Sequence, residues 1–154
     1  MPRAAPPAPL PAPAPVPRVV PPPAPLPPAP PPADWATGPL SPGDWRYTPR
    51  ADTPSAVFRS QGTEFAVFCA DRQITLALAG MHGPPTIRTS FGERRLPAAL
   101  VHSETFGRVP ASDPLLDQMA FSRGHFLVTV DGGPSLVVPA WPEFARVIED
   151  CRGQ

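Results

Sequence analysis

Proline is concentrated at one end of this chain, and its distribution limits what that end can fold into. The 154 residues contain 29 prolines, and seventeen of them lie within residues 1–33, mostly between Ala, Leu and Val. Proline fixes the φ angle and has no backbone N–H to donate, which excludes helix and sheet and favours polyproline II. At about 3.1 Å per residue the segment would reach roughly 100 Å. We therefore predict that residues 1–33 form a disordered Pro/Ala-rich spacer.

Two roles are open for this spacer. Its recurrent Pro-x-x-Pro spacings are typical of ligands for aromatic-lined grooves, whereas a tether would hold the rest of the chain away from whatever anchors the N-terminus. Any Pro-rich tract produces such spacings by chance, which favours the tether. The opening residues MPRAAPPAPL contain no apolar segment of the roughly 7 to 15 residues found in a secretory signal, so the sequence as given carries no signal peptide.

From Asp34 onward the composition is that of a globular domain, and we predict one domain over residues 34–154. Short segments of alternating polarity between turns predict strands. These segments are residues 44–48, 55–60, 63–70, 72–80, 85–90, 93–98, 125–130 and 135–139. The turns between them predict hairpins around Gln61–Gly62, around Phe91–Gly92 and around Asp131–Pro134. The alternation in residues 72–80 predicts a strand with one buried face. Residues 102–111 are predicted to be irregular. The pattern indicates an α+β domain, a small and mainly antiparallel β-sandwich or partly open barrel of six to eight strands.

Two segments predict helices. Residues 112–121, SDPLLDQMAF, offer Ser112 or Asp113 as an N-cap and a proline in the first turn, which favours a short helix. A last helix begins at Pro142, and Glu143 suits the positive end of its dipole. The apolar residues of this helix recur at helical spacing, at Phe144, Val147, Ile148 and Cys151. We therefore predict a C-terminal helix that covers the sheet.

The chain has two cysteines, Cys69 and Cys151. Cys69 continues the face of Phe65 and Val67 in its strand, and Cys151 lies on the apolar face of the last helix. If that helix covers this face, the sulfurs can form a bridge enclosing roughly 80 residues, worth about 4 to 5 kcal/mol by the chain-entropy argument. We favour this disulfide over two buried free thiols. Disulfides persist in oxidising compartments, so the bridge favours a bacterial periplasm or cell surface.

The segments TIRTS, LPA, SDPLLDQMAFSRGHF and VVPAWPEFARVIEDCR resemble an uncharacterised alphaproteobacterial, sphingomonad-type family of small envelope proteins. The resemblance covers Trp35 to Arg152 and is most specific at the C-terminal EDCR motif. It implies an envelope protein of lipoprotein type with a Pro/Ala-rich spacer, and it implies no known activity. This chain departs from the family pattern in two places: it has FCADR where the family has Cys followed directly by Asp-Arg, and it lacks the signal and the lipidated cysteine.

The charge distribution excludes some partners. The 13 basic residues, all arginine, balance 13 acidic residues. Residues 1–33 hold two arginines and no acid, a charge of +2, which leaves 11 arginines against 13 acids, a charge of −2, in the rest. Neither part has the basic stripe that a nucleic-acid backbone requires, so we expect no nucleic-acid partner. No apolar run reaches the length of about 18 residues that a membrane span needs.

The sequence lacks the common motifs of catalytic and metal sites. The histidines, His82, His102 and His125, do not have zinc-site spacing, and the cysteines do not form a Cys-x-x-Cys pair. No Gly-x-Ser-x-Gly elbow and no glycine-rich phosphate loop is found. We therefore expect no enzymatic activity, no metal and no cofactor.

One local cluster suggests binding. Arg88, Arg94 and Arg95 surround the turn Thr89-Ser90-Phe91-Gly92, and guanidinium groups beside hydroxyls can hold a carboxylate, a phosphate or an anionic glycan. We treat Arg88, Ser90, Arg94 and Arg95 as a candidate anion site. The favoured alternative is a solvated hairpin whose charges protect a sheet edge from aggregation.

The leading hypothesis is a non-enzymatic cell-envelope domain that binds or scaffolds an unknown envelope protein or glycan on a Pro-rich tether. One alternative is a periplasmic inhibitor of a lysozyme-like enzyme, which needs a protruding loop, with residues 102–111 as the candidate. The other is a small hydrolase with no recognisable motif, which needs a cleft with convergent titratable groups.

Overall fold

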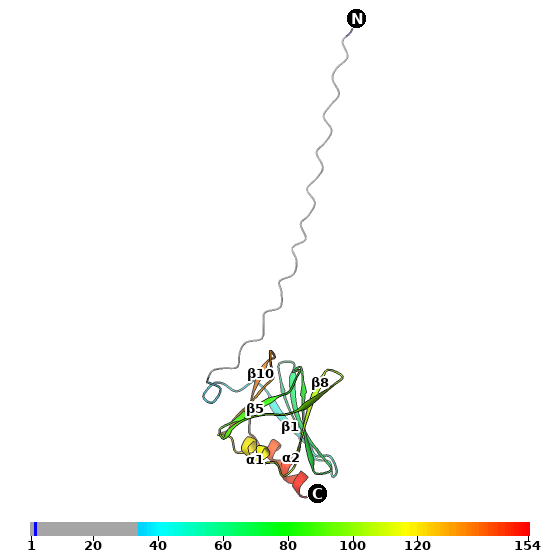
Figure 1. The fold of residues 1–154 in the computed structure, drawn as a ribbon, viewed down its shortest axis with the longest axis vertical. Coiled ribbons are helices and arrows are strands. Elements are labelled where there is room, and N and C mark those ends of the chain that lie inside the picture. The colour runs from blue at the N-terminus through cyan, green and yellow to red at the C-terminus, as the bar shows by residue number, and fades with distance from the viewer. Residues whose placement is uncertain (1, 3–33) are drawn as a thin grey trace.

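A computed structural model describes Pro2 and residues 34–154 (Figure 1), so the predicted spacer lies, apart from Pro2, outside the described residues. Twelve elements make up the described part. In chain order they are β1 (Asp44–Thr48), β2 (Ser55–Ser60), β3 (Thr63–Ala70), β4 (Gln73–Ala79), β5 (Thr86–Thr89), β6 (Gly92–Arg95), β7 (Ala98–Val101), β8 (Glu104–Pro110), α1 (Pro114–Ala120), β9 (His125–Thr129), β10 (Ser135–Pro139) and α2 (Pro142–Arg152). The predicted α+β class with a mainly antiparallel architecture is confirmed.

Six strands form one antiparallel sheet in the order β1-β2-β3-β4-β8-β7. Three of its hairpins turn through two residues that both have positive φ, at Gln61–Gly62, Asp71–Arg72 and His102–Ser103. Such turns match the right-handed twist of the flanking strands. The hairpin predicted around Gln61 and Gly62 is therefore confirmed, while the other two turns contain no glycine.

The remaining four strands form a second antiparallel sheet in the order β10-β9-β5-β6. The hairpins predicted around Phe91–Gly92 and around Asp131–Pro134 are both present. The segment before β1 runs along the outer edge of β10, where the Ser41 N–H donates to the Val137 carbonyl and the Val137 N–H donates to Ser41 Oγ, both at 3.0 Å.

Both predicted helices are present, and both lie toward the end of the molecule that carries the C-terminus (Figure 1). Asp113 caps α1, since its side chain accepts a hydrogen bond from the Leu115 N–H. Helix α2 begins at Pro142 as predicted, and its four apolar residues are all buried. The predicted covering role of α2 is confirmed by its contacts with β1, β2, β3 and β4.

Aromatic rings fill the space between the two sheets and α2. Trp45 lies 5.7 Å from Phe58, 6.0 Å from Phe65 and 5.9 Å from Phe144, measured between ring centroids. Phe144 also contacts Phe126 of the second sheet, at 5.4 Å. The Trp45 indole N–H donates to the Pro139 carbonyl at 2.8 Å, which satisfies the one polar atom of this buried ring. The core therefore joins both sheets through α2.

The prediction that residues 102–111 are irregular is wrong. Residues 104–110 form β8, which pairs with β4 on one side and with β7 on the other. The described residues accordingly contain ten strands rather than six to eight. The turn before β8 uses His102 and Ser103 in place of a glycine or asparagine signal, and Pro97, Gly107 and Pro110 break up the apolar alternation, so this hairpin lacked the usual marks of a strand.

The centre of β4 is buried on both faces, although one buried face was predicted. Thr75 is 4% and Ala77 is 8% exposed on the face opposite the core. Phe68 of β3 pairs with Thr75, and Phe106 of β8 pairs with Ala77, so both rings lie on this outer face beside the smaller side chains. No helix within the described part of the chain is long and apolar enough to cross a lipid bilayer.

Replacing Phe144 by alanine should lower the free energy of unfolding by about 3 to 5 kcal/mol, because it leaves a cavity between the sheets and α2. The matched control is Phe121→Ala. Phe121 is 73% exposed, so the effect of its truncation should stay within about 0.5 kcal/mol. Urea unfolding followed by tryptophan fluorescence measures both, and equal losses would contradict the assignment of the core.

Candidate functional site

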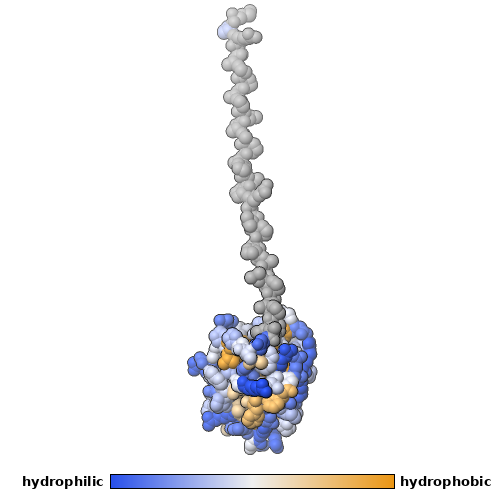
Figure 2. Space-filling view, turned by 90° about the vertical axis from the view of Figure 1, so that its left-hand side faces the viewer, coloured by the Kyte–Doolittle hydropathy of each residue, from blue (hydrophilic) through white to orange (hydrophobic). Residues whose placement is uncertain are grey.

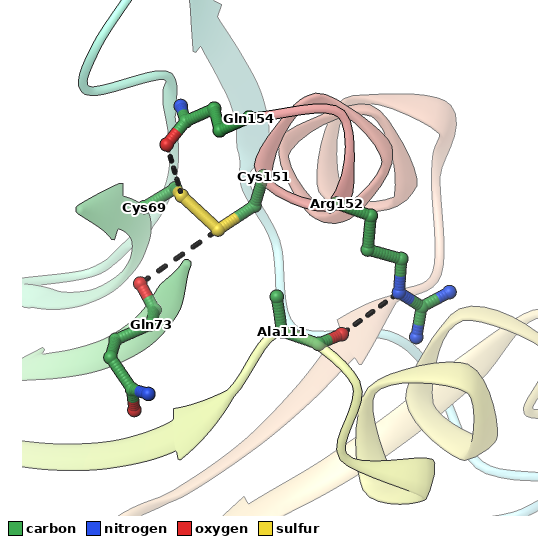
Figure 3. Close-up of a disulfide and its surroundings, with 6 residues drawn as sticks. All are labelled: Cys69, Gln73, Ala111, Cys151, Arg152 and Gln154. Carbon is green, nitrogen blue, oxygen red and sulfur yellow. Dashed lines mark hydrogen bonds between the residues drawn. A yellow bond between two sulfur atoms is a disulfide. The ribbon is translucent and has the colours of Figure 1, made fainter. Parts of the chain in front are cut away.

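The predicted disulfide is confirmed. Cys69 of β3 and Cys151 of α2 are bonded, with Cα atoms 5.6 Å apart and a sequence separation of 82. Both cysteines are fully buried. Gln154 Oε1 lies 3.5 Å from one sulfur and the Gln73 carbonyl lies 3.9 Å from the other (Figure 3). Oxidised sulfurs carry no proton, so both are polar contacts rather than hydrogen bonds.

A second connection holds the end of α2 from the other side. Arg152 Nε donates to the Ala111 carbonyl at 2.8 Å (Figure 3), and Arg152 Nη1 lies 2.9 Å from Asp117 Oδ1. The last turn of α2 is therefore attached to β3 by the disulfide and to α1 by an arginine. This cross-link is structural, because no solvent reaches the sulfurs.

The four residues of the candidate anion site separate into two groups. Arg94 reaches across to the helix cap, where its two terminal nitrogens donate to the Asp113 oxygens at 2.7 and 2.9 Å. Arg95 pairs instead with Asp131, at 2.8 Å. Both guanidinium groups are thus neutralised by carboxylates that the sequence places 19 and 36 residues away.

Arg88 and Ser90 line a groove whose lining does not include Arg94 or Arg95. Arg88 Nε donates to Glu93 Oε2 at 2.6 Å across the β5–β6 hairpin. The Ser90 N–H donates to Ser122 Oγ at 3.0 Å. The structure therefore does not bring all four predicted residues together, and anion binding by that set stays a prediction.

Arg88 and Ser90 line a groove of about 620 Å³ that we name the Trp35 groove. Three segments far apart in the sequence form it: the segment before β1, the β5–β6 hairpin and the loop between α1 and β9. Its lining residues are Trp35, Ala36, Thr37, Arg88, Thr89, Ser90, Phe91, Gly92, Glu93, Ser122, Arg123 and His125.

Two contacts fix the segments of the groove to one another. The ring of His125 meets Trp35 edge-on with centroids 5.5 Å apart, and His125 Nε2 lies 3.1 Å from the Trp35 carbonyl. A carbonyl only accepts, so the proton of this hydrogen bond is on Nε2. Ser122, fully buried, accepts from the Ser90 N–H and joins the hairpin tip to the loop.

The hairpin tip is held in a defined shape. Thr89 Oγ1 donates to the Gly92 carbonyl at 3.2 Å and accepts from the Phe91 N–H at 3.1 Å. This local bonding is typical of threonine in turns. It leaves the Phe91 ring 63% exposed, so the groove has an aromatic side chain that is available for stacking.

The two arginines of the groove differ in their ion pairing. Arg88 is paired with Glu93, whereas Arg123 is exposed and forms no ion pair with any residue from 34 to 154. The surface on the β5 side of the molecule has an apolar area next to strongly hydrophilic residues (Figure 2). In such a groove the aromatic faces can stack on an apolar ring of a ligand. A guanidinium group without an ion-pair partner can bind a carboxylate of the same ligand.

Sequence reasoning identified Arg88 and Ser90 but not the rest of the groove. Neither Trp35 nor Arg123 was predicted to belong to a site. The only available signal was the presence of aromatic and arginine residues within turns. Nothing in the sequence shows that residues 35, 91 and 123 line the same groove.

Within the described residues, no group of three or more His, Cys, Asp or Glu side chains is placed to hold a metal ion. No family model matches the chain, and no curated protein or solved structure shows significant similarity to it. The resemblance to the alphaproteobacterial envelope family, and the location it implies, therefore stay predictions.

Replacing both cysteines by alanine should lower the free energy of unfolding by about 4 to 5 kcal/mol, since the bond closes a long loop in the unfolded chain. Gln154→Ala removes a contact with the sulfur but keeps the bond, and it should unfold as the wild type does. Urea unfolding under non-reducing conditions measures both. An unchanged midpoint in the double variant would contradict the structural role of the bond.

Asp113 should make stability depend on acid pH. Hydrogen bonds from Arg94 hold the pKa of Asp113 below its usual value, and the Leu115 N–H adds to this while burial opposes it. A lowered folded-state pKa stabilises the fold fully above the unfolded pKa of about 3.9, and the stabilisation is lost as the pH falls through the folded value.

The test is Asp113→Asn, which keeps a good N-cap but removes the charge. At neutral pH it should cost about 1 kcal/mol, because the Arg94 side of the pair is half exposed. The difference from wild type should shrink below about pH 4. The control is Asp131→Asn. The Asp131 side chain is 77% exposed, so its substitution should have little effect on the free energy of unfolding at any pH. A difference that is constant with pH would show that the carboxylate charge is not responsible.

Proposed function

We propose that this chain is a non-enzymatic binding module of the cell envelope, carried on a Pro-rich tether, which holds an acidic glycan in the Trp35 groove. The observation that carries the proposal is that Trp35, Phe91 and Arg123 line one groove of about 620 Å³, and that Arg123 forms no ion pair among residues 34–154. This volume lies in the range typical of small-molecule sites, about 300 to 1,000 Å³.

The chemistry of the lining favours an acidic sugar. Indole and phenyl faces stack on the apolar C–H face of a sugar ring, and a guanidinium fork matches a carboxylate. Arg123 has no carboxylate of its own within residues 34–154, so a ligand carboxylate would not have to displace one. A ligand at Arg94 or Arg95 would have to compete with Asp113 or Asp131.

The envelope location is supported by the disulfide. The bond joins two buried cysteines that are 82 residues apart in the sequence. It stabilises the fold only where it stays oxidised, as it does in the periplasm and at the cell surface. The two alternatives receive less support. The inhibitor hypothesis relied on a protruding loop at residues 102–111, and this segment contains β8. No described contact favours the hydrolase over a binding site.

Trp35→Ala and Arg123→Gln should separate the two parts of the site. Titration calorimetry with an oligomer of a uronic acid and with the neutral sugar oligomer of equal length gives the affinities. Arg123→Gln should lower the affinity for the acidic ligand by about 10- to 100-fold, since a hydrogen bond to a charged group contributes about 1.5 to 3 kcal/mol. It should leave the neutral ligand unchanged. Trp35→Ala should weaken both ligands alike.

The matched control is Arg46→Gln, an exposed arginine of β1 outside the groove, which should bind as the wild type does. Circular dichroism of each variant checks that the fold is kept. Equal affinity of the wild type for the acidic and neutral oligomers, or equal affinities for wild type and both groove variants, would refute the proposal. Binding of an envelope protein fraction that the Trp35 variant abolishes, without sugar binding, would identify a protein ligand instead.

A further inference from the structure

The two sheets in the described part of the chain have four outer edges, and three of them are protected. The β1 edge carries the charges of Asp44 and Arg46. The β6 edge carries Glu93 followed by two arginines, all exposed. The β10 edge is covered by hydrogen bonds between Ser41 and Val137. Charges and covering segments are the usual means of preventing an edge from pairing with another chain.

Among residues 34–154, nothing gives the β7 edge any of these protections. Its four residues, Ala98 to Val101, are all apolar and uncharged. Leu100 is 61% exposed and Val101 is 46% exposed. An apolar hollow of about 590 Å³ lies beside the strand, lined by residues that include Phe68 and Phe106. This edge therefore exposes both backbone and apolar side chains.

The register shows which backbone groups of β7 are free to pair. The turn at His102–Ser103 joins Val101 to Glu104, which face each other as the closing pair of a two-residue hairpin. In such a hairpin the closing pair exchanges hydrogen bonds, and successive pairs alternate. The N–H and C=O groups of Ala98 and Leu100 consequently point away from β8, toward the open edge.

We propose that the β7 edge pairs antiparallel with the β7 edge of a second copy of this chain, about a two-fold axis at Ala99. In this register Ala98 of each copy lies opposite Leu100 of the other, and both of these pairs use the free backbone groups. Each pair exchanges two hydrogen bonds, which joins the two six-stranded sheets into one. The same surface is used by both copies, as in a closed dimer.

The side chains of the edge complement one another in this register. The large Leu100 of one copy lies beside the small Ala98 of the other, on the same face of the sheet, and this contact occurs twice. Ala99 at the axis presents only a methyl group, which allows the close approach of a pair without hydrogen bonds. Pro97 lies opposite Val101 of the second copy. An N–H at position 97 would point toward β8, so the proline removes no hydrogen bond from the pairing between the two copies.

Charges at the ends of the edge select the second copy as the partner. Glu104 of β8 pairs with Val101, and Arg108 pairs with Thr75, so both lie on the outer face. Continuing the β7–β8 register by one residue beyond the Ala98–Gly107 pair puts Arg108 in the row of Pro97. Neither Glu104 nor Arg108 forms an ion pair with another residue of the described part. The two-fold register places Glu104 of each copy in one row with Arg108 of the other, about 14 Å apart at three strand spacings. The two side chains can lean toward each other along this row, which brings their opposite charges closer across the interface, so the edge complements itself.

The Pro-rich segment of the chain itself is a poorer occupant. Many of its residues are proline, which donates no N–H and would leave ladder positions empty. A strand from another protein would satisfy the backbone, but it would need its own Glu and Arg at the matching rows.

Sedimentation velocity of the full chain over a series of concentrations tests the proposal. The wild type should dimerise with a concentration-dependent equilibrium. Leu100→Pro removes an N–H that faces the open edge and none from the β7–β8 ladder, so it should keep the fold and abolish the dimer. Circular dichroism and the unfolding midpoint check that the fold is kept.

Charge reversal provides a second test that does not depend on the backbone. Glu104→Arg and Arg108→Glu should each weaken the dimer by about tenfold, as two exposed pairs are lost per dimer. The double variant should restore the wild-type constant. Arg46→Glu at the β1 edge is the control and should have no effect. A wild type that stays monomeric at all concentrations, or a dimer that Leu100→Pro leaves intact, would overturn the proposal, as would a double variant no better than the single ones.

Discussion

The attachment of α2 between the two sheets is the constraint on which the rest of this structure depends. Phe144 enters the space between Trp45 of the first sheet and Phe126 of the second, and the Cys69–Cys151 bond fixes the far end of the same helix. An open pair of sheets of this size exposes apolar residues at its end. Helix α2 closes that end. The disulfide lowers the conformational entropy of the unfolded chain and so stabilises the folded state in which α2 is attached.

Local patterns were enough to predict most of the elements. The alternation in β3 and β4, the proline at the start of each helix and the helical spacing of Phe144, Val147, Ile148 and Cys151 each reflect a backbone preference that acts within a few residues. The disulfide could be predicted as well, because each cysteine lay on an apolar face. The β7–β8 hairpin could not, since the His102–Ser103 turn takes its positive φ angles without glycine. The pairing of β8 with β4 and β7 is a tertiary contact that the local pattern does not show.

The candidate site was less predictable than the fold for a related reason. Side chains near a turn show their type in the sequence but not their partners. Arg94 and Arg95 appeared free in the sequence, yet Asp113 and Asp131 neutralise them in the structure. Arg123 was not predicted as a site residue, yet it lines the Trp35 groove and forms no ion pair among residues 34–154. Ion pairing between distant segments follows from the tertiary fold, so composition alone does not show which charges remain available to a ligand.

The groove and the β7 edge belong to different sheets and share no residue, so each can act without the other. Their combination nevertheless has a physical consequence. A dimer through β7 would carry two grooves, and a polymeric ligand bound in one would be held near the second at a high effective concentration. The gain in affinity depends on whether one ligand molecule can span both grooves. A long repetitive glycan meets this condition more easily than a small ligand does, because its many equivalent units offer several spacings to the second groove.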